Sequence, residues 1–83
     1  MSSGNDSRLR RPRNPMPDYS CQALVRDDLM DAFEKRPPYQ RNDYLGWIAR
    51  AKCAATREKR LAQMLDELAS GDRYMNMVYH AKR

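Results

Sequence analysis

The stretch TREKRLAQMLDELASG, residues 56–71, decides the fold that this sequence predicts. Four apolar residues in it follow the i, i+3, i+4, i+7 spacing of one helix face: Leu61, Met64, Leu65 and Leu68. Thr56 is a suitable N-cap residue, and Gly71 is a suitable residue just after the helix end. We therefore predict an amphipathic helix whose apolar stripe needs a second layer to cover it.

The charges of this helix oppose its macrodipole, because Arg57, Lys59 and Arg60 come first and Asp66 and Glu67 come last. Arg57 lies near the axis of the apolar stripe, so we expect it to point toward the preceding helix and meet the free carbonyl groups at that helix's C-terminus. Arg60 borders the same face, and Lys59 points away from it. The two acidic residues are adjacent, so they point in different directions and do not form a cooperating carboxylate pair.

Two further helical patterns precede this stretch. ALVRDDLMDAFEKRPP, residues 23–38, has a helical repeat that the two prolines end: Val25, Leu29, Ala32 and Phe33. YQRNDYLGWIARAKCAA, residues 39–55, places four residues on one face: Tyr44, Ile48, Ala51 and Ala55. Gly46 falls on the opposite face, and Trp47 flanks the stripe as a core aromatic residue.

Only residues 53–55 separate the second and third patterns, and such a short connection favours antiparallel neighbours. The predicted fold class is therefore all-α, a small three-helix domain built on an antiparallel helical hairpin. We expect this domain over residues 18–83, with 72–83 as a C-terminal tail. The tail is too apolar to be free, so it either folds back over the first helix or forms an extended adhesive strip for a partner chain.

Residues 1–17 differ from the rest in composition. They contain three prolines and a single acid, Asp6, together with four arginines: Arg8, Arg10, Arg11 and Arg13. Such a segment buries too little apolar surface to offset the entropy of ordering it, so we predict a disordered basic arm. It has no apolar run typical of a signal peptide, and no later run is long enough to span a membrane, so we expect a cytoplasmic protein.

The sequence predicts no catalytic, cofactor or metal site. Cys21 and Cys53 have no CxxC spacing and His80 is the single histidine, so zinc ligands are too few. No serine has a histidine or lysine placed beside it by a known motif, and there is no glycine-rich phosphate loop. At 83 residues with a net charge of +5, the chain is expected to be a small, basic, non-enzymatic domain.

A family resemblance rests on an aromatic helix ending with proline, a Tyr-Leu-x-Trp-Ile core, a Lys-x-x-x-Thr-Arg-x-x-Arg motif and an amphipathic helix. Here these are Phe33 with Pro37 and Pro38, Tyr44 to Ile48, and Lys52, Thr56, Arg57 and Arg60. The segment from about 27 to 71 thereby resembles the small helical C-terminal module of the bacteriocin-protection proteins, the YdeI or OmpD-associated family. The resemblance implies no catalytic activity. It implies links to tolerance of bacteriocins and cationic antimicrobial peptides and, in some members, to an outer-membrane porin.

Two functional classes remain open. One is a protein-interaction module with a role in stress or antimicrobial-peptide tolerance and with contacts from the surface of the helical hairpin and from the tail: Arg50, Lys52, Arg57, Lys59, Arg60, Tyr74, Met75, Met77 and Tyr79. The other is a sequence-tolerant binder of nucleic acid or an anionic surface, using the arginine arm and the basic turn end of the hairpin. Arg57 and Arg60 could also form an anion site with the free N–H groups of their helix, instead of a purely structural contact. The sequence names neither the partner nor the oligomeric state.

Overall fold

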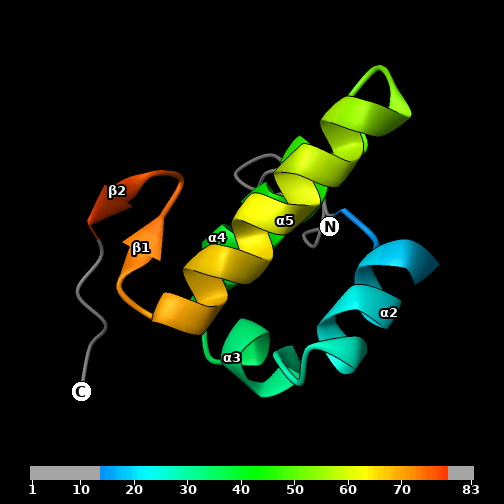
Figure 1. Ribbon diagram of the computed structural model, residues 1–83. Helices are drawn as coiled ribbons and strands as arrows, with labels where there is room; N and C mark the ends of the chain where they lie inside the picture. Colours follow the sequence, from blue (N-terminus) through cyan, green and yellow to red (C-terminus); the bar gives the residue numbers. More distant parts are fainter. Residues whose placement is uncertain (1–13, 79–83) are drawn as a thin grey trace, which may run out of the picture.

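The computed structural model describes residues 14–78. Within this range it contains four α-helices and a two-stranded sheet, in the order α2 (Asp18–Arg26), α3 (Met30–Glu34), α4 (Pro38–Ala49), α5 (Ala54–Ser70), β1 (Arg73–Tyr74) and β2 (Met77–Val78) (Figure 1). The protein is thus mostly helical, as predicted. The three expected helices become four, and the tail contributes a short hairpin.

Helix α5 contains the apolar stripe that the sequence predicts. Its four stripe residues are all buried, in a core that also contains Leu24, Phe33, Tyr44 and Ile48. The helix begins three residues earlier than predicted, since Cys53 and not Thr56 is the N-cap residue. It ends at Ser70 and is capped by Gly71, whose φ of 82° is a left-handed conformation that glycine adopts without steric cost.

The predicted single helix over residues 23–38 is wrong, because a left-handed residue divides it into α2 and α3. Asp28 has φ 58°, its N–H donates to the carbonyl of Val25, and the N–H of Leu29 donates to the carbonyl of Leu24. This pair of bonds is a Schellman motif, in which Leu29 follows the left-handed residue and comes back toward Leu24. Val25, expected in the apolar stripe, is consequently 63% exposed.

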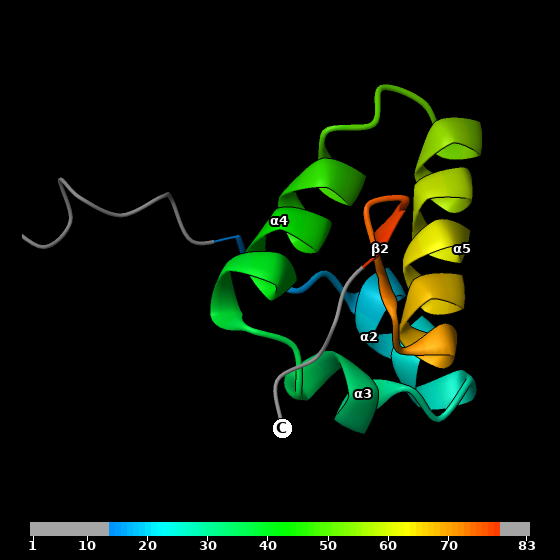
Figure 2. The same ribbon diagram turned by 90° about the vertical axis from the view of Figure 1, so that its left-hand side faces the viewer.

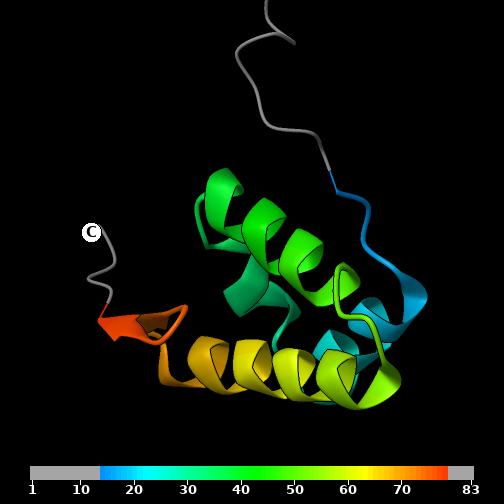
Figure 3. The same ribbon diagram turned by 90° about the horizontal axis from the view of Figure 1, so that it is seen from above.

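Helix α4 starts on Pro38, where a missing N–H costs nothing, and ends at Ala49. Ala51 and Ala55, expected on its apolar face, therefore lie beyond it. Residues 50–53 connect α4 to α5, and the two helices lie side by side and run in opposite directions (Figures 2 and 3). Helices α2 and α3 pack across them and close the core.

The N-terminal segment 14–17 packs against α4. The backbone N–H of Asn14 donates to Asn42 Oδ1 at 2.7 Å, and its side-chain amide donates to the Asn42 carbonyl at 3.2 Å. A Cβ atom on Gly46 would lie 2.7 Å from Asn14 Nδ2. Gly46 is thus on the face opposite the core, as predicted, but the chain covers that face and its backbone needs the space. The four arm arginines lie outside the described residues.

The described part of the tail folds into a β-hairpin instead of covering the first helix. Strands β1 and β2 are antiparallel, with Arg73 opposite Val78 and Tyr74 opposite Met77. Met75 and Asn76 form the turn, with φ 51° and 66°, as a two-residue hairpin turn of this type requires. The hairpin lies beside the C-terminal end of α5, away from α2 (Figures 1 and 3). Tyr79 lies outside the described residues.

Candidate interaction surfaces

A buried carboxylate joins the hairpin to the helices. Glu67 is 3% exposed, and its carboxylate accepts four hydrogen bonds. Two come from the backbone N–H groups of Met75 at 2.8 Å and Asn76 at 2.7 Å. The others come from the Tyr44 hydroxyl at 2.5 Å and the Gln63 side-chain amide at 3.2 Å. Every described partner is a donor, so the site is built for an ionised carboxylate.

The pKa values of this pair follow from that geometry. Burial alone raises the pKa of Glu67, but the hydrogen bonds from Tyr44, Asn76, Met75 and Gln63 outweigh burial and hold this pKa below its usual value. Burial first, and then the bond to Glu67, raise the pKa of Tyr44. Tyr44 therefore remains a donor and Glu67 remains an acceptor at neutral pH, which makes them a structural pair instead of a proton-transfer pair.

Arginines from other elements satisfy the carbonyl groups at the ends of two helices. Arg60 of α5 donates to the Trp47 carbonyl in the last turn of α4 at 2.7 Å, and its guanidinium lies 5.4 Å from the Trp47 ring centre. Arg36 is buried and donates to the Glu67 carbonyl near the end of α5 at 3.0 Å. Arg60 thus places a positive charge at the negative end of the α4 dipole, and Arg36 places one at the negative end of the α5 dipole.

The residue predicted to make the contact with α4 was the wrong one. Arg57 lies over the ring of Tyr19 in α2, with its guanidinium carbon 4.8 Å from the ring centre. Its predicted position on the inner face of α5 is correct, but α2 covers that part of α5. Arg60, one turn further along α5, makes the contact with α4 instead. Both arginines make structural contacts in the described part of the chain.

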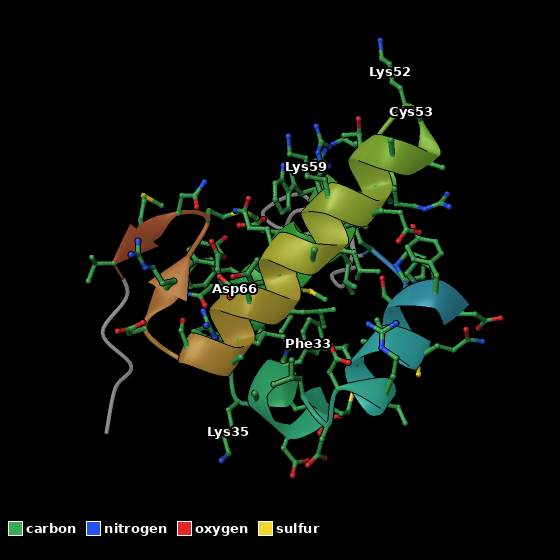
Figure 4. All side chains as sticks on the ribbon, viewed as in Figure 1. Phe33, Lys35, Lys52, Cys53, Lys59 and Asp66 are labelled. Carbon is green, nitrogen blue, oxygen red and sulfur yellow. The ribbon has the colours of Figure 1, made fainter. Side chains whose placement is uncertain are left out.

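The turn between α4 and α5 is basic and solvent-exposed. Arg50, Lys52 and Lys59 are all exposed, and Figure 4 shows Lys52 and Lys59 at the end of α5 opposite Asp66. Cys53, also exposed, lies at the same end. The Thr56 hydroxyl and the backbone N–H groups of Thr56 and Ala55 lower the pKa of Cys53. This end of the α4–α5 helix pair presents positive charge to solvent.

The predicted tail contacts fall into two groups. Tyr74 and Met75 are partly buried against the core, and the Tyr74 hydroxyl donates to Asp43 Oδ2 at 2.6 Å. Met77 and Val78 on β2 are 58% and 69% exposed. Tyr39, at the start of α4, is 49% exposed, and its ring meets that of Tyr74 edge-on at 6.0 Å. We refer to Tyr39, Met77 and Val78 as the hairpin patch.

Sequence reasoning missed Glu67 and Tyr39. No binding or structural role is predicted for Glu67 from the sequence, because nothing in a single sequence indicates that a turn eight residues later will donate to it. Tyr39 directly follows the two prolines and belongs to no apolar stripe. Its exposure depends on where the hairpin packs.

The part of the chain that the structure describes contains neither a candidate metal cluster nor a helix that could cross a membrane. Between residues 14 and 78, no three histidine, cysteine, aspartate or glutamate side chains are grouped as a metal site would require. Across the same range, no helix has both the length and the apolar character needed to cross a bilayer.

These features define a small helical protein in which the buried side chains of Arg36, Gln40, Tyr44 and Glu67 are hydrogen-bonded within the fold. The chain belongs to the family described as bacteriocin-protection, YdeI or OmpD-associated, whose family model matches residues 15–71. The match is wider than the segment that carries the resemblance, since it reaches back through α2 to Pro15. It ends at Gly71, before the hairpin. Neither the curated proteins nor the solved structures include a significant match to this chain.

Proposed function

We propose that this chain is a non-enzymatic protein-interaction module, and that residues 15–71 are a version of the small helical module of the family. The observation that carries the proposal is the hairpin patch. Met77 and Val78, consecutive apolar residues of β2, are exposed on a hairpin whose turn donates two backbone hydrogen bonds to a buried carboxylate. An ordered surface with exposed apolar groups loses little entropy when a partner covers it.

The polar groups support a binding role over a catalytic one. Glu67, Tyr44 and Asp43, which could act as acid or base, are each engaged in hydrogen bonds that maintain the fold. A general acid or base needs a proton-transfer partner in a substrate, and these side chains are directed at one another.

Variants of the hairpin patch test the proposal. The full chain, immobilised and cross-linked in extract of its source cell, should retain a protein that the Met77→Ser, Val78→Ser double variant retains at least about tenfold less, as expected for loss of apolar anchors. Val25→Ser is the matched control, since Val25 is 63% exposed on α2, on the other side of α5 from the hairpin. Equal retention by the double variant and by the wild type contradicts the proposal.

Family membership supports a role in tolerance of bacteriocins or cationic antimicrobial peptides. We propose that the protein acts in the cytoplasm. A deletion strain should be more sensitive to such peptides, and the wild-type gene should restore tolerance where the hairpin-patch double variant does not. If the wild-type gene and the double variant both restored tolerance, the hairpin patch would not be needed for tolerance. Fractionation of the cell tests the location.

The second candidate function is binding of nucleic acid or another anionic surface. The observation in its favour is the joint exposure of Arg50, Lys52 and Lys59 at the turn between α4 and α5. The arginine arm would add four positive charges, and binding by such groups falls steeply with salt concentration. A DNA titration separates the two classes, with the outcomes given at the end of the Discussion.

A further inference from the structure

The C-terminal hairpin is attached to the helices by few groups. Its turn is held through the N–H groups of Met75 and Asn76, which donate to Glu67. Its first strand is held through Tyr74, whose ring meets Tyr44 edge-on at 5.4 Å and whose hydroxyl donates to Asp43. The second strand is mainly exposed and contributes little buried apolar area. The hairpin is therefore attached by fewer hydrogen bonds and less buried apolar surface than the helices of the core.

The turn itself is strained. Met75 and Asn76 both have positive φ, which is unfavourable for a residue with a Cβ atom, and most of all for a long side chain such as Met75. Turns of this geometry favour Asn-Gly, and this chain has neither of those residues at its preferred position. The bonds to Glu67 offset the strain, so the closed hairpin depends on that carboxylate.

Gly71 provides a hinge between the helices and the hairpin. Its φ is 82°, and a Cβ atom placed on it would meet no heavy atom within 4 Å, so the chain is unobstructed at this point. The family match ends at the same residue. The hairpin therefore lies outside the segment that the family model matches.

If the hairpin moved away from the helices, the carboxylate of Glu67 would not be left without hydrogen-bond partners. Glu67 lies at the boundary between α5 and the hairpin, so water can replace the two N–H groups of the turn while Tyr44 and Gln63 keep their bonds. A carboxylate enclosed on all sides by helices would oppose such a movement, because its desolvation would be uncompensated.

We propose that residues 72–78 form a strap that opens as a unit about Gly71 while α2 to α5 stay folded, and that opening uncovers the Tyr44 ring and the Glu67 carboxylate. The strap is a conformational device of the fold and does not depend on which partner the protein has. The surface it covers combines an aromatic ring with two carboxylates, Asp43 and Glu67, that accept hydrogen bonds.

Amide hydrogen exchange followed by NMR on the full chain tests the strap. In the wild type, the amides of Met75 and Asn76 should exchange at least about tenfold faster than those of Met64 and Leu65 in α5, because local opening precedes global unfolding. Glu67→Gln replaces one acceptor oxygen of the carboxylate by an NH2 donor, which faces the donors that surround it. The exchange rates at Met75 and Asn76 should therefore rise about tenfold or more, while those in α5 stay unchanged. Asp66→Asn, the exposed neighbour, should change neither.

Tyr74→Ala keeps the test decisive if Glu67→Gln unfolds the helices. This variant removes only groups on the hairpin side, so exchange at Met75 and Asn76 should rise again while α5 stays protected. Two results would overturn the proposal. One is acceleration of Met64 and Leu65 by the same factor as the turn in Tyr74→Ala, which would make the hairpin and helices one cooperative unit. The other is no change at the turn in either variant.

Discussion

At the scale of single residues, the clearest feature is that arginines donate hydrogen bonds to carbonyl groups near the ends of neighbouring helices. Arg60 spans α5 and α4 with both a hydrogen bond and a ring contact to Trp47. Arg60→Ala should lower the free energy of unfolding by about 1–2 kcal/mol, since it leaves a helix-end carbonyl without its donor and removes a cation–π contact. Chemical denaturation followed by Trp47 fluorescence measures this. Lys59→Ala, at an exposed position of the same turn, should change stability by less than about 0.5 kcal/mol.

A second residue-scale prediction concerns Gly46 and the segment that covers it. A mid-helix Gly→Ala change ordinarily stabilises by about 1 kcal/mol. Here the new methyl group would lie 2.7 Å from Asn14 Nδ2 and displace its bonds to Asn42. Gly46→Ala should therefore stabilise by about 1 kcal/mol in an Asn14→Ala background and by clearly less in the wild type. Equal effects in the two backgrounds, measured by denaturation, would show that Asn14 does not lie against α4.

At the scale of elements, the break between α2 and α3 depends on one left-handed residue. Asp28→Gly should stabilise the protein by up to about 1 kcal/mol, because glycine adopts φ 58° without the steric cost that aspartate bears. Thermal and chemical denaturation measure the change. If residues 23–36 formed one continuous helix, the same substitution would instead destabilise by about 1 kcal/mol.

The pH dependence of the hairpin attachment is also an element-scale prediction. Despite burial, hydrogen bonds lower the pKa of Glu67, so the ionised form stabilises the folded state. That contribution is fully present above the ordinary carboxyl pKa of about 4.3 and is lost as the pH falls through the lower native pKa. The stability difference between the wild type and Glu67→Gln should therefore be largest near neutral pH and shrink from about pH 5 to about pH 3. The difference for Asp66→Asn, the control, should show no such narrowing.

The elements that the sequence predicts well are those with strong local signals. The stripe of α5 and its terminal Gly71 are read directly from spacing and residue type. The α2–α3 break was missed because its left-handed position holds Asp28 instead of glycine, so the apolar repeat continues across it unmarked. The role of Glu67 and the partner of Arg60 were missed because both depend on which groups from distant segments face them, and local periodicity carries no such information.

At the scale of the whole molecule, charge and exposed apolar surface are separated. Figures 1 and 4 together place the basic turn, with Lys52 and Lys59, at one end of α5 and the hairpin at the other. Arginines within the helical body are engaged internally at Trp47 and Glu67, which leaves Arg50, Lys52 and Lys59 as the basic group at that turn. A protein partner should therefore approach the hairpin end, and an anionic partner the turn end.

We propose that the partner is a protein and not nucleic acid, and a DNA titration discriminates between these two classes of partner. Full-length protein is titrated with generic duplex and single-stranded DNA at about 50 mM and about 200 mM salt, beside a variant in which Arg8, Arg10, Arg11 and Arg13 are serine. We expect at most weak binding that is absent at the higher salt concentration. Micromolar, salt-sensitive binding that persists at about 200 mM salt and disappears in the serine variant would contradict the claim and identify a nucleic-acid binder.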